Sequence, residues 1–311
     1  MMKKYLIGID IGGTSIKIGL FNLEGILLEK WAIPSNKTEN GNHILTEIAQ
    51  AIEKKYNLEE VNGIGFGVPG PVQNNKVIHC VNLGWKEVDV TSEFSKHLKK
   101  AYSLRIKVAN DANLAAAGER FQGIAKGYDN VCMFTLGTGI GSGIIINGSI
   151  VEGYNGFAGE LGHMVIDSTN QILCNCGKQG CLETVASATG IVSLAQIHLA
   201  NSLEDSLLRF VKKLSAKKVI DFAKMGDILA NRIADESMDY LAYAMALITY
   251  VIDPGIFVIG GGVSNAGDFL IQKIEQHYYK YVKPFILHTT FKIATLGNDA
   301  GIYGAAYMVK E

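Results

Sequence analysis

The amino-acid sequence predicts an α/β fold of two related domains with a cleft between them. The chain has 311 residues, which suffices for two domains of about 150 residues each. Apolar runs of strand length alternate with segments of helical periodicity, as in proteins built on mostly parallel sheets. A strand-like run followed by a glycine turn occurs twice, at Gly12 and again 125 positions later at Gly137. This recurrence indicates an internal duplication.

The first half begins with a predicted β-hairpin. Residues 5–11 are apolar and rich in β-branched side chains, Gly12-Gly13-Thr14 follows, and apolar residues then recur with the two-residue period of a strand. A helix is expected at 44–56, and strands at 61–68 and 106–109. The last of these strands ends in Asn110-Asp111-Ala112-Asn113, after which an alanine-rich helix begins. Because α/β sheets bind ligands at the carboxyl ends of their strands, Asp111 is well placed for chemistry.

The second half repeats the pattern. Residues 131–146 predict a second hairpin with Gly137-Thr138-Gly139 at its turn, and residues from about 190 to 250 are helical. A buried strand at 256–259 precedes the turn Gly260-Gly261-Gly262, with Ser264 as the expected cap of the next helix. The final strand, 291–296, leads to a terminal helix. We expect one domain to contain residues 1–110 and 299–311, and the other residues 111–298.

The composition excludes several classes of partner. The chain is 48% hydrophobic and 19% charged, with a net charge of −1, so it has no general attraction to nucleic acid or acidic membranes. No apolar run reaches the ~18 residues of a membrane span. Asp10 interrupts the first apolar run too early for a signal peptide. The five cysteines are an odd number, which fits a reducing cytoplasm better than a set of disulfides.

The most informative stretch contains one imidazole and three thiols within nineteen positions. These are His163, Cys174, Cys176 and Cys181. A Cys3His set is typical of a closed structural zinc site. The alternative is that the cysteines are small reduced core residues. Their spacing favours zinc and predicts a zinc-binding loop at 163–183. Such a loop could hold Glu160, His163 and Glu183 rigidly toward a small polar ligand.

The glycine turns favour nucleotide binding. Neither is a Walker A loop, and neither opens a helix as a dinucleotide fingerprint does. Bare backbone N–H groups in a hairpin can nevertheless form an anion-binding nest, and two facing hairpins could clamp a triphosphate. The third turn, Gly260-Gly261-Gly262, would suit adenosine. The alternative is that the glycines serve only the tight turns.

Five segments, in order and with intact spacing, resemble the ROK family of repressors, open reading frames and kinases. They are residues 9–14, 110–113, 136–141, 159–163 and 174–183. The resemblance covers essentially the whole chain and implies a two-domain fold like that of actin, hexokinase and Hsp70, which is a duplicated ribonuclease H-like fold. Within the family, residues 181–191 and 297–301 are most similar to the glucokinases of Gram-positive bacteria.

The resemblance also implies roles for individual residues. Asp111 resembles the general base that accepts the proton of the attacking sugar hydroxyl. The sugar contacts would be Gly70, Asn82, Asn110, Asp111, Glu160, His163 and Glu183. Asp10 resembles a carboxylate near Mg²⁺, and Thr14 and Lys17 resemble groups on the γ-phosphate side, although Lys17 could be a solvated strand residue. The nucleotide contacts would be Asp10, Gly12, Gly13, Thr14, Lys17, Gly137, Thr138, Gly139, Gly260, Gly261 and Gly262.

The function implied is ATP-dependent phosphorylation of a hexose, D-glucose at its 6-hydroxyl, with a fructokinase or N-acetylmannosamine kinase as alternatives. The cofactors would be Mg²⁺ with the ATP and a structural Zn²⁺, and the assembly a homodimer or homotetramer. A sugar-sensing regulator of the family is a more remote alternative. Such regulators carry a DNA-reading module ahead of the first hairpin, whereas the first strand here begins at about Tyr5. A chaperone-type ATPase would need a peptide-binding domain. A phosphoryl donor other than ATP stays open.

Overall fold

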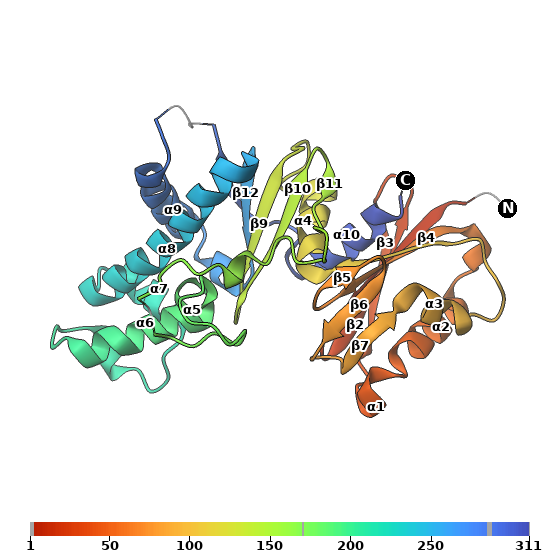
Figure 1. Cartoon of the computed structure of the whole chain (residues 1–311), viewed down its shortest axis with the longest axis horizontal. Helices are drawn as coiled ribbons and strands as arrows, with labels where there is room; N and C mark the ends of the chain where they lie inside the picture. Colours follow the sequence, from red (N-terminus) through yellow and green to blue (C-terminus); the bar gives the residue numbers. More distant parts are fainter. Residues whose placement is uncertain (1–2, 170, 285–287, 311) are drawn as a thin grey trace.

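The chain forms two lobes, each built around a five-stranded β-sheet (Figure 1). The computed structural model describes residues 3–169, 171–284 and 288–310. The first sheet contains β1 Tyr5–Ile11, β2 Ser15–Asn22, β3 Leu27–Pro34, β4 Val61–Val68 and β8 Arg105–Asn110. The same lobe holds a small sheet of β5 Val72–Gln73, β6 Lys76–Cys80 and β7 Trp85–Asp89, with helices α1 Thr38–Gly41, α2 Ile44–Lys55 and α3 Val90–Lys96.

The second lobe has the same plan with more helices. Its sheet contains β9 Val131–Leu136, β10 Ile140–Ile146, β11 Ser149–Ile150, β12 Ile256–Gly260 and β13 Thr290–Ile293. Its helices are α5 Glu183–Ala186, α6 Ala188–Asn201, α7 Ala216–Lys224, α8 Ile228–Ile252 and α9 Asp268–Tyr281. None of the helices in the described residues has the length and apolarity needed to cross a membrane.

The two five-stranded sheets have matching strand orders. The first runs β3-β2-β1-β4-β8 and the second β11-β10-β9-β12-β13. In each, the first three strands are antiparallel and the last two pair in parallel. This agreement confirms the predicted duplication, since the two glycine hairpins are the β1–β2 and β9–β10 connections.

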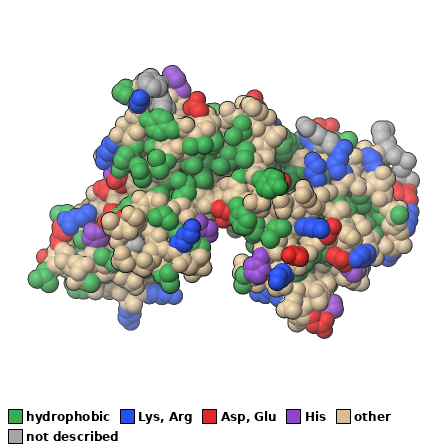
Figure 2. All heavy atoms as spheres, in the orientation of Figure 1, with side chains coloured by type: hydrophobic (Ala, Val, Ile, Leu, Met, Phe, Trp, Pro, Cys, Tyr) green, Lys and Arg blue, Asp and Glu red, His purple; other side chains and the backbone are tan. Residues whose placement is uncertain are grey.

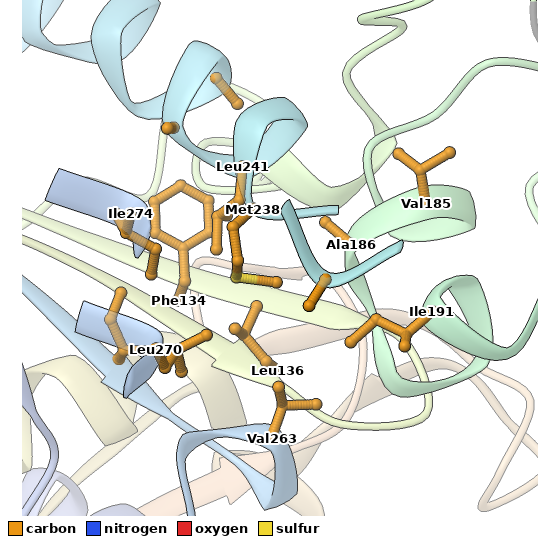
Figure 3. Close-up of a cluster of buried hydrophobic side chains, with 14 of the residues drawn as sticks. Phe134, Leu136, Val185, Ala186, Ile191, Met238, Leu241, Val263, Leu270 and Ile274 are labelled. Carbon is orange, nitrogen blue, oxygen red and sulfur yellow. The ribbon is translucent and has the colours of Figure 1, made fainter. Parts of the chain in front are cut away.

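The helices of the second lobe cover its sheet through a large apolar core (Figure 3). Phe134 and Leu136 on β9 pack with Met238 of α8 and Ile274 of α9, and all four are almost completely buried. Because successive residues of a strand point to opposite faces, the alternation along β9 places Phe134 and Leu136 together on this face. The helices cover this face of the sheet, and residues at the carboxyl ends of β9 and β12 line the space between the lobes.

Two helices lie between the sheets and connect the lobes. They are α4 Asp111–Gln122, which follows β8, and α10 Ala300–Met308, which follows β13. They pack closely because each contributes a glycine: a Cβ on Gly118 would lie 2.1 Å from the Ala300 carbonyl oxygen, and one on Gly304 would lie 1.9 Å from the Leu114 carbonyl oxygen. Both crossings of the chain between the lobes are therefore held against each other.

Two local predictions were wrong. Ser264 does not cap α9, because its hydroxyl donates to the Gly261 carbonyl oxygen at 2.7 Å, and Gly267, with φ of 64°, separates it from the helix. The last strand ends at Ile293 rather than at residue 296. There the backbone leaves the sheet, and the Leu296 N–H donates to the Glu119 carboxylate at 2.8 Å instead of to a neighbouring strand.

Candidate active site

A cleft of about 1180 Å³ lies between the lobes, and Figure 2 shows the notch on one side of the molecule. Its walls come from both sheets, both glycine hairpins and the cysteine-containing loop. Most residues predicted to bind ligands line it: Asp10, Lys17, Gly70, Asn82, Asn110, Asp111, Gly137, Thr138, Gly139, Glu160, His163, Cys176, Glu183 and Gly261. The other predicted residues are not among those that line the cleft: Gly12, Gly13, Thr14, Gly260, Gly262, Cys174 and Cys181.

Asp111 is the first residue of α4 and opens onto the cleft. Its Oδ1 accepts a hydrogen bond from the Ala112 N–H at 2.8 Å. The pKa of Asp111 is raised to about 6, mainly by desolvation in the cleft and also by the negative charges of Asp10 and Glu160, while hydrogen bonds from backbone N–H groups partly oppose the rise. A carboxylate with a pKa near neutrality is suited to accept a proton from an alcohol and to release it again.

Asn110 fixes the start of this helix. Its Oδ1 caps the helix by accepting from the N–H groups of Ala112 at 2.9 Å and Asn113 at 3.2 Å. Its Nδ2 donates to the Gly70 carbonyl oxygen at 3.1 Å. Gly70 has φ of 110°, and a Cβ there would lie 2.5 Å from the His79 carbonyl oxygen. Only glycine fits this position. The hydrogen bond between Asn110 and Gly70 therefore ties the start of the Asp111 helix to the β4–β5 turn.

Asp10 and Lys17 are opposite each other on β1 and β2. Their charged atoms are 3.6 Å apart, and the Lys17 Nζ also donates to the Asn298 carbonyl oxygen at 2.6 Å. Burial raises the pKa of Asp10, and the Lys17 charge opposes that rise. This pair places a carboxylate and an ammonium group beside the first hairpin. A metal–phosphate ligand would use both, because the carboxylate attracts the cation and the ammonium group attracts the phosphate.

The hairpin turns leave space for a phosphate chain. The N–H groups of Gly12 and Gly137 are already used, donating at 3.0 Å to the Ser15 and Gly139 carbonyl oxygens. Any backbone contact with phosphate therefore falls to later amides in each turn, such as those of Gly13 and Thr138. A Cβ on Gly13 would meet no atom within 4 Å, and one on Gly137 would approach only the Gly139 carbonyl oxygen, at 3.9 Å.

The third glycine turn is built for close packing. Gly261 has φ of 82°, and a Cβ there would lie within 2.6 Å of the Leu136 backbone. Gly261 can thus approach the end of β9 and still face the cleft. Gly262 begins a 3-10 helix, Gly262–Ala266, and faces open space.

The four predicted metal ligands come together. The candidate ligand atoms of His163, Cys174, Cys176 and Cys181 all lie within 4.8 Å of one another. The Cys176 and Cys181 Sγ atoms are 3.6 Å apart, and the Cys174 Sγ is 3.5 Å from the His163 Nδ1. A tetrahedral zinc ion with bonds of about 2.0–2.3 Å requires ligand atoms ~3.3–3.8 Å apart, and the Cys176–Cys181 and Cys174–His163 distances lie in this range, so the donor set is compatible with zinc.

His163 and Glu183 connect this cluster to the cleft. The His163 Nδ1 faces the thiols, while its Nε2 points toward Glu160, 3.9 Å from the carboxylate. The Glu183 Oε1 accepts from the Cys174 Sγ at 2.9 Å, and its Oε2 is 3.4 Å from the Ile140 N–H at the base of the second hairpin. A rigid cysteine loop would therefore orient three polar side chains that line the cleft.

The structure also places residues in the cleft that sequence reasoning did not assign. They include His79, Phe157, Lys178, Gly297, Asn298 and Gly301. Gly297, Asn298 and Gly301 lie in segment 297–301, which the sequence analysis singled out without a role, and a Cβ on Gly301 would lie 3.0 Å from the Asp10 carboxyl carbon. His79, Phe157 and Lys178 carry no local sequence signal.

Comparison with known proteins identifies the family. A sequence model of the ROK family matches residues 6–311. The chain belongs to the ROK family. Among ROK relatives, it is 40% identical to the glucokinase of Halalkalibacterium halodurans, over 100% of this chain and 96% of that protein. It is 37% identical to the glucokinase of Thermotoga maritima, over 100% of this chain and 99% of that one.

Solved structures agree with this assignment. A ROK family glucokinase from Streptomyces griseus, crystallised in complex with glucose and AMPPNP, superposes with a TM-score of 0.75 at 30% identity, covering 98% of each chain. The predicted two-domain fold like that of actin and hexokinase is therefore confirmed, as is membership of the ROK family.

Proposed function

We propose that this ROK protein is an ATP-dependent sugar kinase that converts D-glucose to glucose 6-phosphate. The observation that carries the proposal is the position of Asp111, which lies in the same cleft as the glycine hairpins and the polar side chains of the cysteine loop. Full-length similarity to two glucokinases supports glucose as the acceptor.

Asp111 would act as the general base. Phosphoryl transfer passes through a loose transition state, so the enzyme mainly positions the reactants and stabilises charge. In the ionised form Asp111 would accept the proton of the sugar 6-hydroxyl as its oxygen attacks the γ-phosphorus and ADP leaves. A carboxylate base contributes about 10²–10⁴-fold. A primary alcohol reaches such a base more easily than a ring hydroxyl.

The sugar hydroxyls would be held by the groups around Asp111. Glu160, His163 and Glu183 come from the second lobe, and Gly70, Asn82 and Asn110 from the first. Their side chains are carboxylates, amides and an imidazole, which suit a neutral polyol rather than an anionic sugar phosphate. In an epimer one hydroxyl points in another direction and leaves its protein partner unpaired. Each unpaired group costs about 1–3 kcal/mol, so epimers would be poorer substrates.

ATP would bind between the two glycine hairpins, with its adenosine near Gly260, Gly261 and Gly262. Mg²⁺ bound with the nucleotide would neutralise phosphate charge, and Asp10 is the residue that would hold it. Thr14 and Lys17 would face the γ-phosphate. Zn²⁺ held by the cysteine loop would fix the direction of the His163 ring, as other metal-bound imidazoles are oriented. We further propose that residues 1–110 with 299–311 close against residues 111–298 and exclude water.

The test is sugar-dependent ADP release by the purified protein with MgATP and a panel of D-glucose, D-fructose and N-acetylmannosamine. We expect the highest kcat/KM for glucose. A higher value for another sugar would refute glucose as the substrate but retain the kinase, whereas no sugar-dependent ADP release would refute the kinase itself.

A further inference from the structure

Glu119 is a completely buried carboxylate outside the proposed chemistry. It lies on α4, two helical turns beyond Asp111, and its side chain has no exposed surface. The Oε1 accepts from the Leu296 N–H at 2.8 Å. The Oε2 accepts from the Ile124 N–H at 2.9 Å and from the Thr295 hydroxyl at 3.2 Å. Buried charged groups are costly unless they are hydrogen-bonded, and this one has three donors.

Two of these donors belong to the segment by which the chain returns to the first lobe. Thr295 and Leu296 follow β13 and precede the short 3-10 helix Gly297–Asp299, which leads into α10. Gly297 and Asn298 line the cleft, and the Asn298 carbonyl oxygen accepts from the Lys17 Nζ at 2.6 Å. The return segment and Asp10 therefore together hold the Lys17 ammonium group.

We propose that Glu119 is a positioning residue for the nucleotide side of the cleft. It ties the return segment, residues 295–298, to the helix that begins with Asp111, so that the Lys17 ammonium group and the catalytic carboxylate keep a fixed relation. The inference rests on the proposed kinase function, and it assigns Glu119 no contact with substrate.

A carboxylate is the side chain that this position requires. Its two oxygens accept all three hydrogen bonds, and ionised acceptors form stronger bonds than neutral ones. Glutamine has the same shape, but its amide nitrogen would face either the Leu296 N–H or the pair of donors at Oε2. The surrounding space is closed as well, since a Cβ on Gly123 would lie 2.0 Å from the Glu119 Oε2.

The experiment compares Glu119→Gln and Thr295→Val with wild type by direct binding. Calorimetry measures the Kd of a non-hydrolysable MgATP analogue, and separately the Kd of glucose without nucleotide. We expect Glu119→Gln to weaken analogue binding on the order of ten-fold, the loss of one hydrogen bond to a charged group, with glucose affinity changed less than about two-fold. Thr295→Val, which removes one donor, should show a smaller change in the same direction.

Arg120→Met is the matched control. Arg120 is the next residue of the same helix, and it binds the Tyr128 carbonyl oxygen at 3.0 Å, Asp129 at 2.9 Å and the Tyr307 hydroxyl at 2.6 Å, but not the return segment. The Arg120→Met variant should have a lower melting temperature than wild type without a selective loss of affinity for the MgATP analogue. Equal losses of analogue and glucose affinity in Glu119→Gln, or an unchanged analogue Kd in both Glu119→Gln and Thr295→Val, would overturn the inference. Wild-type protein that binds the analogue but transfers no phosphate would instead count against the kinase proposal.

Discussion

Acidification should inactivate the proposed kinase at a pH set by Asp111. General-base catalysis needs the ionised carboxylate, so the rate should fall as the pH drops through the pKa of Asp111, which the cleft raises to about 6. At pH 7.5 about 97% of such a group is ionised, and at pH 5 about 9%, which corresponds to a roughly ten-fold loss of kcat/KM. An ordinary aspartate, with a pKa near 3.9, would lose only about a tenth of its ionised fraction over the same interval.

Glu160→Gln separates this titration from that of the substrate. The terminal phosphate of ATP also titrates near pH 6, but identically for every variant. The negative charge of Glu160 is one cause of the raised Asp111 pKa. Removing this charge should therefore shift the acid limb of the pH–rate profile, the range in which the rate falls with acidification, to lower pH. Glu152→Gln, in the loop before Glu160, is the control and should leave the limb in place.

The assay is the initial rate of glucose 6-phosphate formation between pH 4.5 and 8, measured on quenched samples so that no coupling enzyme limits the range. Glucose is kept well below its KM, so that the profile reports the free enzyme. An acid limb near pH 4 in wild type would contradict the raised pKa. An identical limb in wild type and Glu160→Gln would contradict a contribution of the Glu160 charge to the Asp111 pKa.

Three further outcomes are expected. Asp111→Asn should lower kcat by at least ~10²-fold with little change in glucose affinity, and single-turnover rates near wild type would remove Asp111 from the mechanism. Elemental analysis should find one zinc per chain in wild type and in the control Cys80→Ala, but not in Cys176→Ser, which should lose stability and glucose affinity together. Fully active wild-type protein with less than about a tenth of an equivalent of zinc per chain would refute the zinc site. Gly137→Val should weaken MgATP binding and spare glucose binding, because its side chain would fill open space at the hairpin, and the opposite pattern would refute the two-hairpin clamp.

Local sequence patterns determined the strands, the hairpins and the metal cluster. Apolar alternation and a glycine turn are properties of adjacent residues, so the two similar hairpins and the strands that follow them could be anticipated, whereas the edge strands β3 and β11 were not. The Cys3His cluster was visible because three of its four ligands lie within eight positions, from Cys174 to Cys181. Asp111 was identifiable because it directly follows a strand, and resemblance to the ROK family then suggested its role.

Long-range packing decided the rest. Lys17 meets the Asn298 carbonyl oxygen across 281 positions, and Glu119 meets Leu296 across 177, which no periodicity within either segment encodes. The Leu296 N–H makes this contact beyond the end of the last strand, which is shorter than its apolar run predicted. The raised pKa of Asp111 is likewise a tertiary property, because it depends on desolvation and on the charges of Asp10 and Glu160, which reach the cleft from different lobes. The sequence could name these carboxylates, but only the folded chain brings their charges close enough to change how one of them binds a proton.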